Sequence, residues 1–246
     1  MSSVRWPLDL SHAYRAYSFT WSLGWGWLYH FAEVTMAPTV GLLVPLVSKT
    51  AQTSALEDFL ETGYGLVQSE PKTLQWFALS YESSYPPTYA IFDTFAADDG
   101  RSDHLGGPIA AALTKSADEL LSTPPEIGKV DVLASVVRPV TSGEKTAGVT
   151  VGLRVLIKAK PEKASAVRDF LKSAVSLVEQ EPETLYWYAV EFPGTNNFGI
   201  VDFFPDDKGR AAHVAGQVAE ALFASVDELL TGAPEIMQVK VLAAKV

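Results

Sequence analysis

The stretch "DDGRSDHLGGPIAAAL" at residues 98–113 returns, with changes, as "DKGRAAHVAGQVAEAL" at residues 207–222. Each stretch carries a Gly-Arg pair followed closely by one histidine, His104 in the first and His213 in the second. An internal repeat is decisive for a fold because both copies are expected to form the same structural unit. The extent of the repeat around these histidines therefore sets the architecture.

The repeat covers most of the chain. Before the histidines, "EPKTLQWFAL" from Glu70 matches "EPETLYWYAV" from Glu181 at an offset of 111 residues. After them, "DELLSTPPEIGKVDVLA" from Asp118 matches "DELLTGAPEIMQVKVLA" from Asp227 at an offset of 109. Matches of this length at near-constant offset indicate a tandem duplication.

Each copy predicts the element order β-α-β-β-α-β. In the first copy, Leu56, Phe59 and Leu60 recur at helical spacing, and Pro86-Pro87 marks a turn between two strands. The expected strands are at 40–48, 73–81, 86–95 and 128–137, and the expected helices at 53–67 and 98–113.

This order is that of the ferredoxin-like split βαβ module, in which the helices cover one face of the sheet. Both faces of the predicted central strand are apolar, with Trp76 on one side and Phe77 on the other. A second sheet is therefore expected against the uncovered face. The sequence predicts an α+β fold in which two βαββαβ modules form a pseudo-dimeric α+β barrel within one chain, as two four-stranded sheets packed face to face.

The expected boundaries are a first module at 39–137, a polar linker at 138–148 and a second module at 149–246. Residues 1–38 form an aromatic-rich extension that holds four of the six Trp residues. Two interpretations of it stay open. It forms a helix that packs on the domain or lies at a membrane interface, or Met36 is the true start of translation.

Composition excludes several classes of function. The chain of 246 residues has a net charge of -10 and no basic run, which argues against a nucleic-acid partner. It contains no Cys, so disulfides, thiolate nucleophiles and Cys-ligated metals are ruled out. The absence of Cys fits a reducing compartment, and a cytoplasmic location is expected.

With the Glu-Pro-x-Thr-Leu start of the second strand and the histidine of the second helix, the chain resembles the antibiotic biosynthesis monooxygenase (ABM) family of the dimeric α+β barrel superfamily. The resemblance covers residues 40–137 and 149–245. Members are usually single modules that dimerise. The resemblance implies one of three roles, namely cofactor-free oxygenation of polyketide quinols or anthrones in secondary metabolism, heme degradation, or a small protein without a known reaction.

The resemblance maps the helix-borne histidine of the family onto His104 and His213. In the heme-degrading branch this histidine is an iron ligand and works with an Asn on the first strand. Here the only Asn residues are Asn196 and Asn197, in a predicted hairpin. No cofactor is therefore expected. No metal is expected either, because acidic residues ahead of a helix, such as Asp98, usually cap it.

The two histidines are the candidate catalytic residues. Both are placed in the first turn of a predicted helix, where the partial positive charge disfavours imidazolium. A neutral imidazole beside an apolar pocket suits a base that deprotonates a phenol or anthrone. The alternative is that each histidine hydrogen-bonds a carboxylate, Asp93 or Asp202, and only fixes the helix.

Aromatic and basic residues near these histidines are the candidate substrate-binding groups. Aromatic rings could stack on a planar ligand, or they could belong to the core. The arginines could hold a substrate oxyanion, or they could pair with neighbouring Asp residues. The candidates are Trp76, Trp187, Phe77, Tyr188, Arg101 and Arg210.

The leading hypothesis is a cofactor-independent, ABM-like monooxygenase that oxidises an aromatic polyketide-type substrate, an anthrone or a quinol. The alternative is a non-catalytic α+β barrel that binds a small ligand or responds to stress. Expected partners are a small aromatic or apolar ligand and, through outer helices or strand edges, a second copy of the fused pair.

Overall fold

The computed structural model describes residues 36–138 and 145–246. Residues 1–35 of the predicted N-terminal extension and most of the predicted linker lie outside these residues. The first half contains β1 (Val40–Val47), α1 (Thr53–Val67), β2 (Thr73–Tyr81), β3 (Thr88–Phe95), α2 (Asp98–Leu105), α3 (Pro108–Leu120) and β4 (Gly128–Val137). The second half contains β5 (Val151–Lys158), α4 (Ala164–Ser173), α5 (Val175–Val178), β6 (Tyr186–Glu191), β7 (Asn197–Phe204), α6 (Asp207–Val214), α7 (Gln217–Ala224), α8 (Val226–Leu229) and β8 (Glu235–Lys245).

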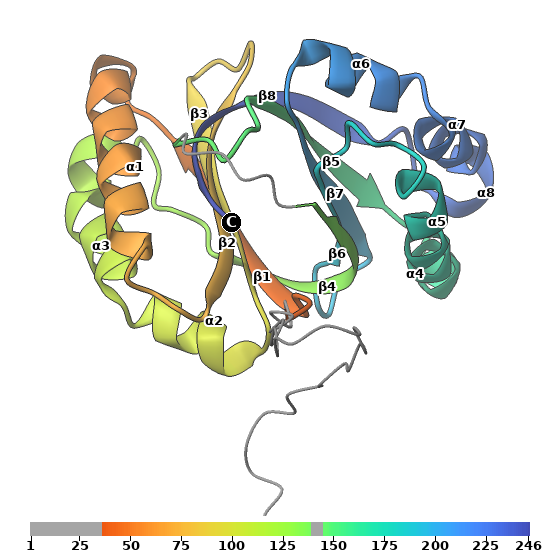
Figure 1. The fold of residues 1–246 in the computed structure, drawn as a ribbon, viewed down its shortest axis with the longest axis horizontal. Helices are drawn as coiled ribbons and strands as arrows, with labels where there is room; N and C mark the ends of the chain where they lie inside the picture. The colour runs from red at the N-terminus through yellow and green to blue at the C-terminus, as the bar shows by residue number, and fades with distance from the viewer. Residues whose placement is uncertain (1–35, 139–144) are drawn as a thin grey trace, which may run out of the picture. The chain divides into compact units, whose positions relative to one another are not determined.

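The strands form one closed antiparallel barrel in the order β1-β3-β2-β8-β5-β7-β6-β4. The α+β class and the barrel predicted from the sequence are therefore confirmed. The helices lie outside it, with α1 and α3 over β2 and β3, and α4 and α5 over the opposite wall (Figure 1). No helix among residues 36–138 and 145–246 is long and apolar enough to cross a membrane.

The last strand of each half joins the two halves, which the sequence analysis did not predict. β4 pairs with β1 through residues 128–131 and with β6 through residues 131–137. β8 likewise pairs with β5 and then with β2. The expectation of two separate sheets stacked face to face is therefore corrected. These long strands satisfy backbone groups that open sheet edges would leave unpaired.

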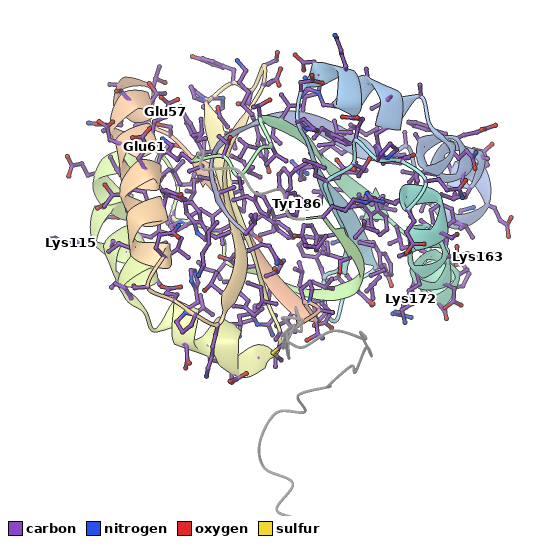
Figure 2. The ribbon with its side chains drawn as sticks, viewed as in Figure 1. Glu57, Glu61, Lys115, Lys163, Lys172 and Tyr186 are labelled. Carbon is purple, nitrogen blue, oxygen red and sulfur yellow. The ribbon has the colours of Figure 1, made fainter. Side chains whose placement is uncertain are left out.

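Aromatic side chains from both halves fill the barrel interior. The rings of Phe77 and Phe203 stack with centroids 4.0 Å apart, and Phe92 meets Tyr188 edge-on at 5.1 Å. Figure 2 shows Tyr186 inside the barrel, whereas charged side chains point outward from the helices. This packing explains why both faces of the strands are apolar.

The helix predicted at 98–113 is two helices in the structure. α2 ends at Leu105 and α3 begins at Pro108. The second half has the same break between α6 and α7, where Gln217 stands in the place of Pro108, so the proline is not required for it. In both halves a glycine, Gly107 or Gly216, precedes the second of the two helices. This break moves His104 from the expected first turn of a long helix to the last turn of a short one.

Candidate functional site

His104 lies between two carboxylates. Its Nδ1 is 2.6 Å from Oε2 of Glu70, and its Nε2 is 3.3 Å from Oδ2 of Asp93. Glu70 lies in the turn between α1 and β2, and Thr73 donates its hydroxyl to the same Oε2 at 2.8 Å. Asp93 lies in β3, opposite Trp76 of β2, and is fully buried. We call Glu70, His104 and Asp93 the first cluster.

The second half builds the same arrangement. His213 Nδ1 is 2.5 Å from Oε2 of Glu181, and His213 Nε2 is 3.1 Å from Oδ2 of Asp202. Thr184 donates its hydroxyl to Glu181 at 3.0 Å. We call Glu181, His213 and Asp202 the second cluster. The sequence analysis named Asp93 and Asp202 as alternative partners of the histidines, and that pairing is present.

The helix position of His213 alters its expected charge. It lies in the last turn of the short helix α6, and the partial negative charge at a helix C-terminus favours imidazolium. Burial acts to lower the pKa of His213, but the charge of Asp202 and hydrogen bonds to Asp202 and Glu181 outweigh it and raise that pKa to about 10. His213 is therefore protonated at neutral pH, and the prediction of a neutral base is wrong for it.

Burial also raises the pKa values of the two aspartates that contact the two histidines. Burial raises the pKa of Asp93 to about 7, against the lowering effect of His104. Burial also raises the pKa of Asp202, against the charge of His213. A carboxylate whose pKa lies near 7 is a much better base at neutral pH than an ordinary aspartate. Asp93 therefore has the properties that the sequence analysis assigned to His104.

The predicted aromatic residues do not form one binding surface. Trp76 and Trp187 face the helices and lie in two separate helix-side cores, whereas Phe77 and Tyr188 point into the barrel interior. Neighbouring residues on a strand point to opposite faces of the sheet, which accounts for the separation. Of the four, only Trp76 lines a cavity that also contains a cluster histidine.

A small cavity of about 30 Å³ lies beside the first cluster, between α1, α3 and the sheet. His104, Asp93 and Trp76 form part of its wall. The indole N–H of Trp76 is buried and has no hydrogen-bond partner among the described residues. Two further lining residues, the half-buried Phe59 and the 42% exposed Ile127, place its rim near the surface.

A larger cleft of about 350 Å³ lies beside the second cluster. His213 and Glu181 line it together with polar groups such as Gln180 and Gln217. Neither Trp187 nor Asp202 lines it. The second cluster therefore borders a surface cleft whose wall contains no Phe, Tyr or Trp.

The two candidate arginines are held by other protein groups. Arg101 donates to Asp98 at 2.6 Å and to the Val130 carbonyl at 3.1 Å. Arg210 donates to Asp207 at 2.6 Å and, across the two halves, to Glu82 at 2.9 Å. Neither arginine lines the cavity or the cleft. The alternative of pairing with nearby acidic residues is the arrangement observed.

The acidic residues of α2 are also paired within the protein. Lys72 lies 2.8 Å from both Asp99 and Asp103. Within residues 36–138 and 145–246, no group of three or more His, Cys, Asp or Glu side chains has an arrangement that could hold a metal ion.

A closed antiparallel barrel with βαββαβ elements and outer helices defines an α+β barrel protein of the ferredoxin-like type. No family model matches the sequence, and the search of curated proteins finds no relative. Solved structures do match. A candidate monooxygenase from Fusobacterium nucleatum aligns with a TM-score of 0.74 at 15% identity, over 85% of this chain and 94% of that chain.

Two further structures also match. An anthrone oxidase-like protein aligns with a TM-score of 0.57 at 10% identity, over 86% of this chain and 94% of that one. The protein NE2512 from Nitrosomonas europaea, of unknown function, is 43% identical over 40% of this chain and 94% of its own, with a TM-score of 0.39. The chain therefore shares the fold of the candidate monooxygenase and of the anthrone oxidase-like protein.

Proposed function

We propose that the protein is an ABM-like monooxygenase that uses O2 without a bound cofactor to oxidise an electron-rich aromatic substrate, an anthrone or a quinol. The observation that carries the proposal is Asp93, a buried carboxylate with a pKa of about 7 at the wall of a cavity. At about 30 Å³ this cavity is smaller than an anthrone, so the proposal requires α1 and α3 to move apart when the substrate binds. The fold shared with an anthrone oxidase-like protein supports the same reaction class. We further propose that the two halves act as a fused pair in place of a dimer.

The reaction releases no net proton, and the first cluster lets the buried Asp93 exchange protons with solvent. Asp93 accepts a proton from the substrate, and its carboxylate contacts His104 Nε2. The other ring nitrogen of His104 contacts Glu70, whose side chain is 13% exposed. A proton taken up inside can therefore leave through the imidazole to a carboxylate that reaches solvent.

The reaction balances without a further reductant. Deprotonation of the anthrone methylene gives a stabilised carbanion, which transfers one electron to O2, and the resulting radical and superoxide form a C–O bond. The peroxide anion regains a proton from Asp93. Loss of the second methylene proton with cleavage of the O–O bond gives the ketone and water. The substrate loses four electrons, and O2 gains four.

The second cluster is assigned a structural role. His213 is protonated at neutral pH, and Asp202 does not reach the neighbouring cleft. This cluster therefore anchors α6 to the sheet. The assignment supplies a matched control, because Asp202 occupies the position in the second half that Asp93 occupies in the first.

The test is O2 consumption by purified protein with anthrone as the probe. Wild type and Asp202→Asn are expected to consume O2, and Asp93→Asn to be slower by about 100-fold or more, the usual effect of removing a general base. Circular dichroism establishes that each variant is folded. Equal rates for Asp93→Asn and wild type would overturn the assignment of the base.

One observation favours the second candidate function, a non-catalytic barrel that binds a small ligand. Both ring nitrogens of each cluster histidine are engaged by carboxylates, as expected for histidines that only fix a helix. On this alternative the folded wild-type protein consumes no O2 with anthrone or a quinol. The same measurement therefore separates the two functions.

A further inference from the structure

The cavity beside the first cluster has the character of a site for a small apolar molecule. Of the residues that line it, only Asp93 and His104 are ionisable, and the rest are mainly aliphatic or aromatic. Its volume of about 30 Å³ leaves room for one molecule of roughly diatomic size. Mainly apolar cavities take up apolar guests such as xenon, although the unpaired polar atoms of Trp76 and Asp93 in this wall mean that water competes for the site.

A glycine keeps this cavity open. Gly63 lies on the buried face of α1 and lines the cavity. A Cβ at this position would lie 3.4 Å from Cζ2 of Trp76 and 3.6 Å from Cδ1 of Ile109, in ordinary contact with both. Glycine inside a helix costs about 1 kcal/mol relative to alanine. The chain thus carries a helix-weakening residue where a methyl group would fit and would occupy the cavity.

The second half carries that methyl group. Ala174 occupies the position equivalent to Gly63, is 3% exposed and lies in the same core as Trp187 and Val218. The helix is interrupted there, between α4 and α5. Val218 takes the place of Ile109 and is one methylene smaller. In the second half, the side chain facing the helix is therefore smaller, while the helix residue Ala174 is larger than Gly63. The two halves therefore differ at this position: Gly63 leaves space beside Trp76, and Ala174 fills the equivalent space.

We propose that the cavity beneath Gly63 binds one small apolar molecule, and that in the proposed reaction this molecule is O2. The identity of O2 rests on the proposed function, whereas the binding of a small apolar guest does not. The site lies against Trp76 and Asp93, so O2 bound there lies beside Asp93, the base that generates the carbanion. Gly63 is then the residue that sets access of O2 to the first site.

The chain contains a matched control in the same helix. Gly65 also lies in α1, but it is exposed, and a Cβ there would have no atom within 4 Å. Gly63→Ala and Gly65→Ala therefore change the helix propensity equally, and only the first changes the cavity.

The test is a crystal structure of the full chain under xenon pressure. A xenon atom is expected between residue 63, Trp76 and Ile109 in wild type and Gly65→Ala, with at least fivefold lower occupancy in Gly63→Ala. In turnover with anthrone, Gly63→Ala is expected to raise the KM for O2 several-fold while the KM for anthrone stays unchanged.

The outcomes separate the two proposals. No xenon in the wild-type cavity, or equal occupancy in Gly63→Ala, overturns the cavity site whatever the activity. Xenon bound as expected by a protein that consumes no O2 with anthrone or a quinol supports the cavity site and overturns the oxygenase. An unchanged KM for O2 in an active Gly63→Ala enzyme overturns the assignment of O2 as the guest.

Discussion

His213 Nε2 lies 3.1 Å from the carboxylate of Asp202, and Nδ1 of the same ring lies 2.5 Å from Glu181. One buried imidazole thus joins α6 to a barrel strand and to the turn before β6. With its pKa raised to about 10, the ring is an imidazolium at neutral pH, and both contacts are ion pairs. The arrangement makes stability depend on pH.

The first prediction concerns His213→Gln. The folded pKa of about 10 lies above the unfolded value near 6.5, so the stabilisation is complete below about pH 6.5 and is lost as pH rises through about 10. His213→Gln is expected to lower the free energy of unfolding by about 3 kcal/mol at pH 6, as for other broken buried pairs. Urea titrations from pH 6 to 10 should show this difference shrinking. A difference that grows with pH would contradict the assigned charge.

The second prediction concerns the contact between the two halves made by Arg210. Glu82→Gln removes a partner whose side chain is 25% exposed, and we expect a loss of about 1–2 kcal/mol. Asp207→Asn removes the other partner of the same arginine, which is 78% exposed, and is expected to cost less than about 1 kcal/mol. Urea denaturation of both variants at one pH gives the comparison. The reverse ranking would show that the pair between the halves adds little.

The third prediction concerns stability at the two glycines of α1. Gly65→Ala is expected to raise the free energy of unfolding by about 1 kcal/mol through helix propensity alone. Gly63→Ala adds about 0.8 kcal/mol, because its methyl group is also buried against Trp76 and Ile109. Chemical denaturation measures both. A destabilised Gly63→Ala would mean that the space beneath the helix is smaller than the structure shows.

Much of the fold could be predicted from the repeat. Because the same apolar pattern occurs twice, the strands and first helices were placed close to their observed bounds. The joining of the halves through β4 and β8 could not be predicted, since the hydrophobic pattern of a strand does not specify which strand it pairs with. The break between α2 and α3 was also missed, and Pro108 alone does not explain it, because the second half breaks at the same place without a proline.

The candidate site was predicted only in part. The histidines and their aspartate partners follow from the repeat, because His104 with Asp93 and His213 with Asp202 share one offset. Glu70 was aligned with its counterpart in the second copy but was treated as a strand marker. Its contact with His104 links residues 34 positions apart through a turn that local pattern does not define. The assignment of the base to Asp93 in place of His104 depends on the burial of Asp93, which only the folded structure shows.

The most direct test of the account is the pH dependence of kcat/KM for O2 consumption with anthrone. Asp93 faces His104, Glu70 and Arg101, and its pKa is about 7. Activity should therefore rise with pH through an apparent pKa near 7 in wild type and in Asp202→Asn, and this rise should disappear in Asp93→Asn. A flat profile in wild type, or an unchanged rise in Asp93→Asn, would contradict the account.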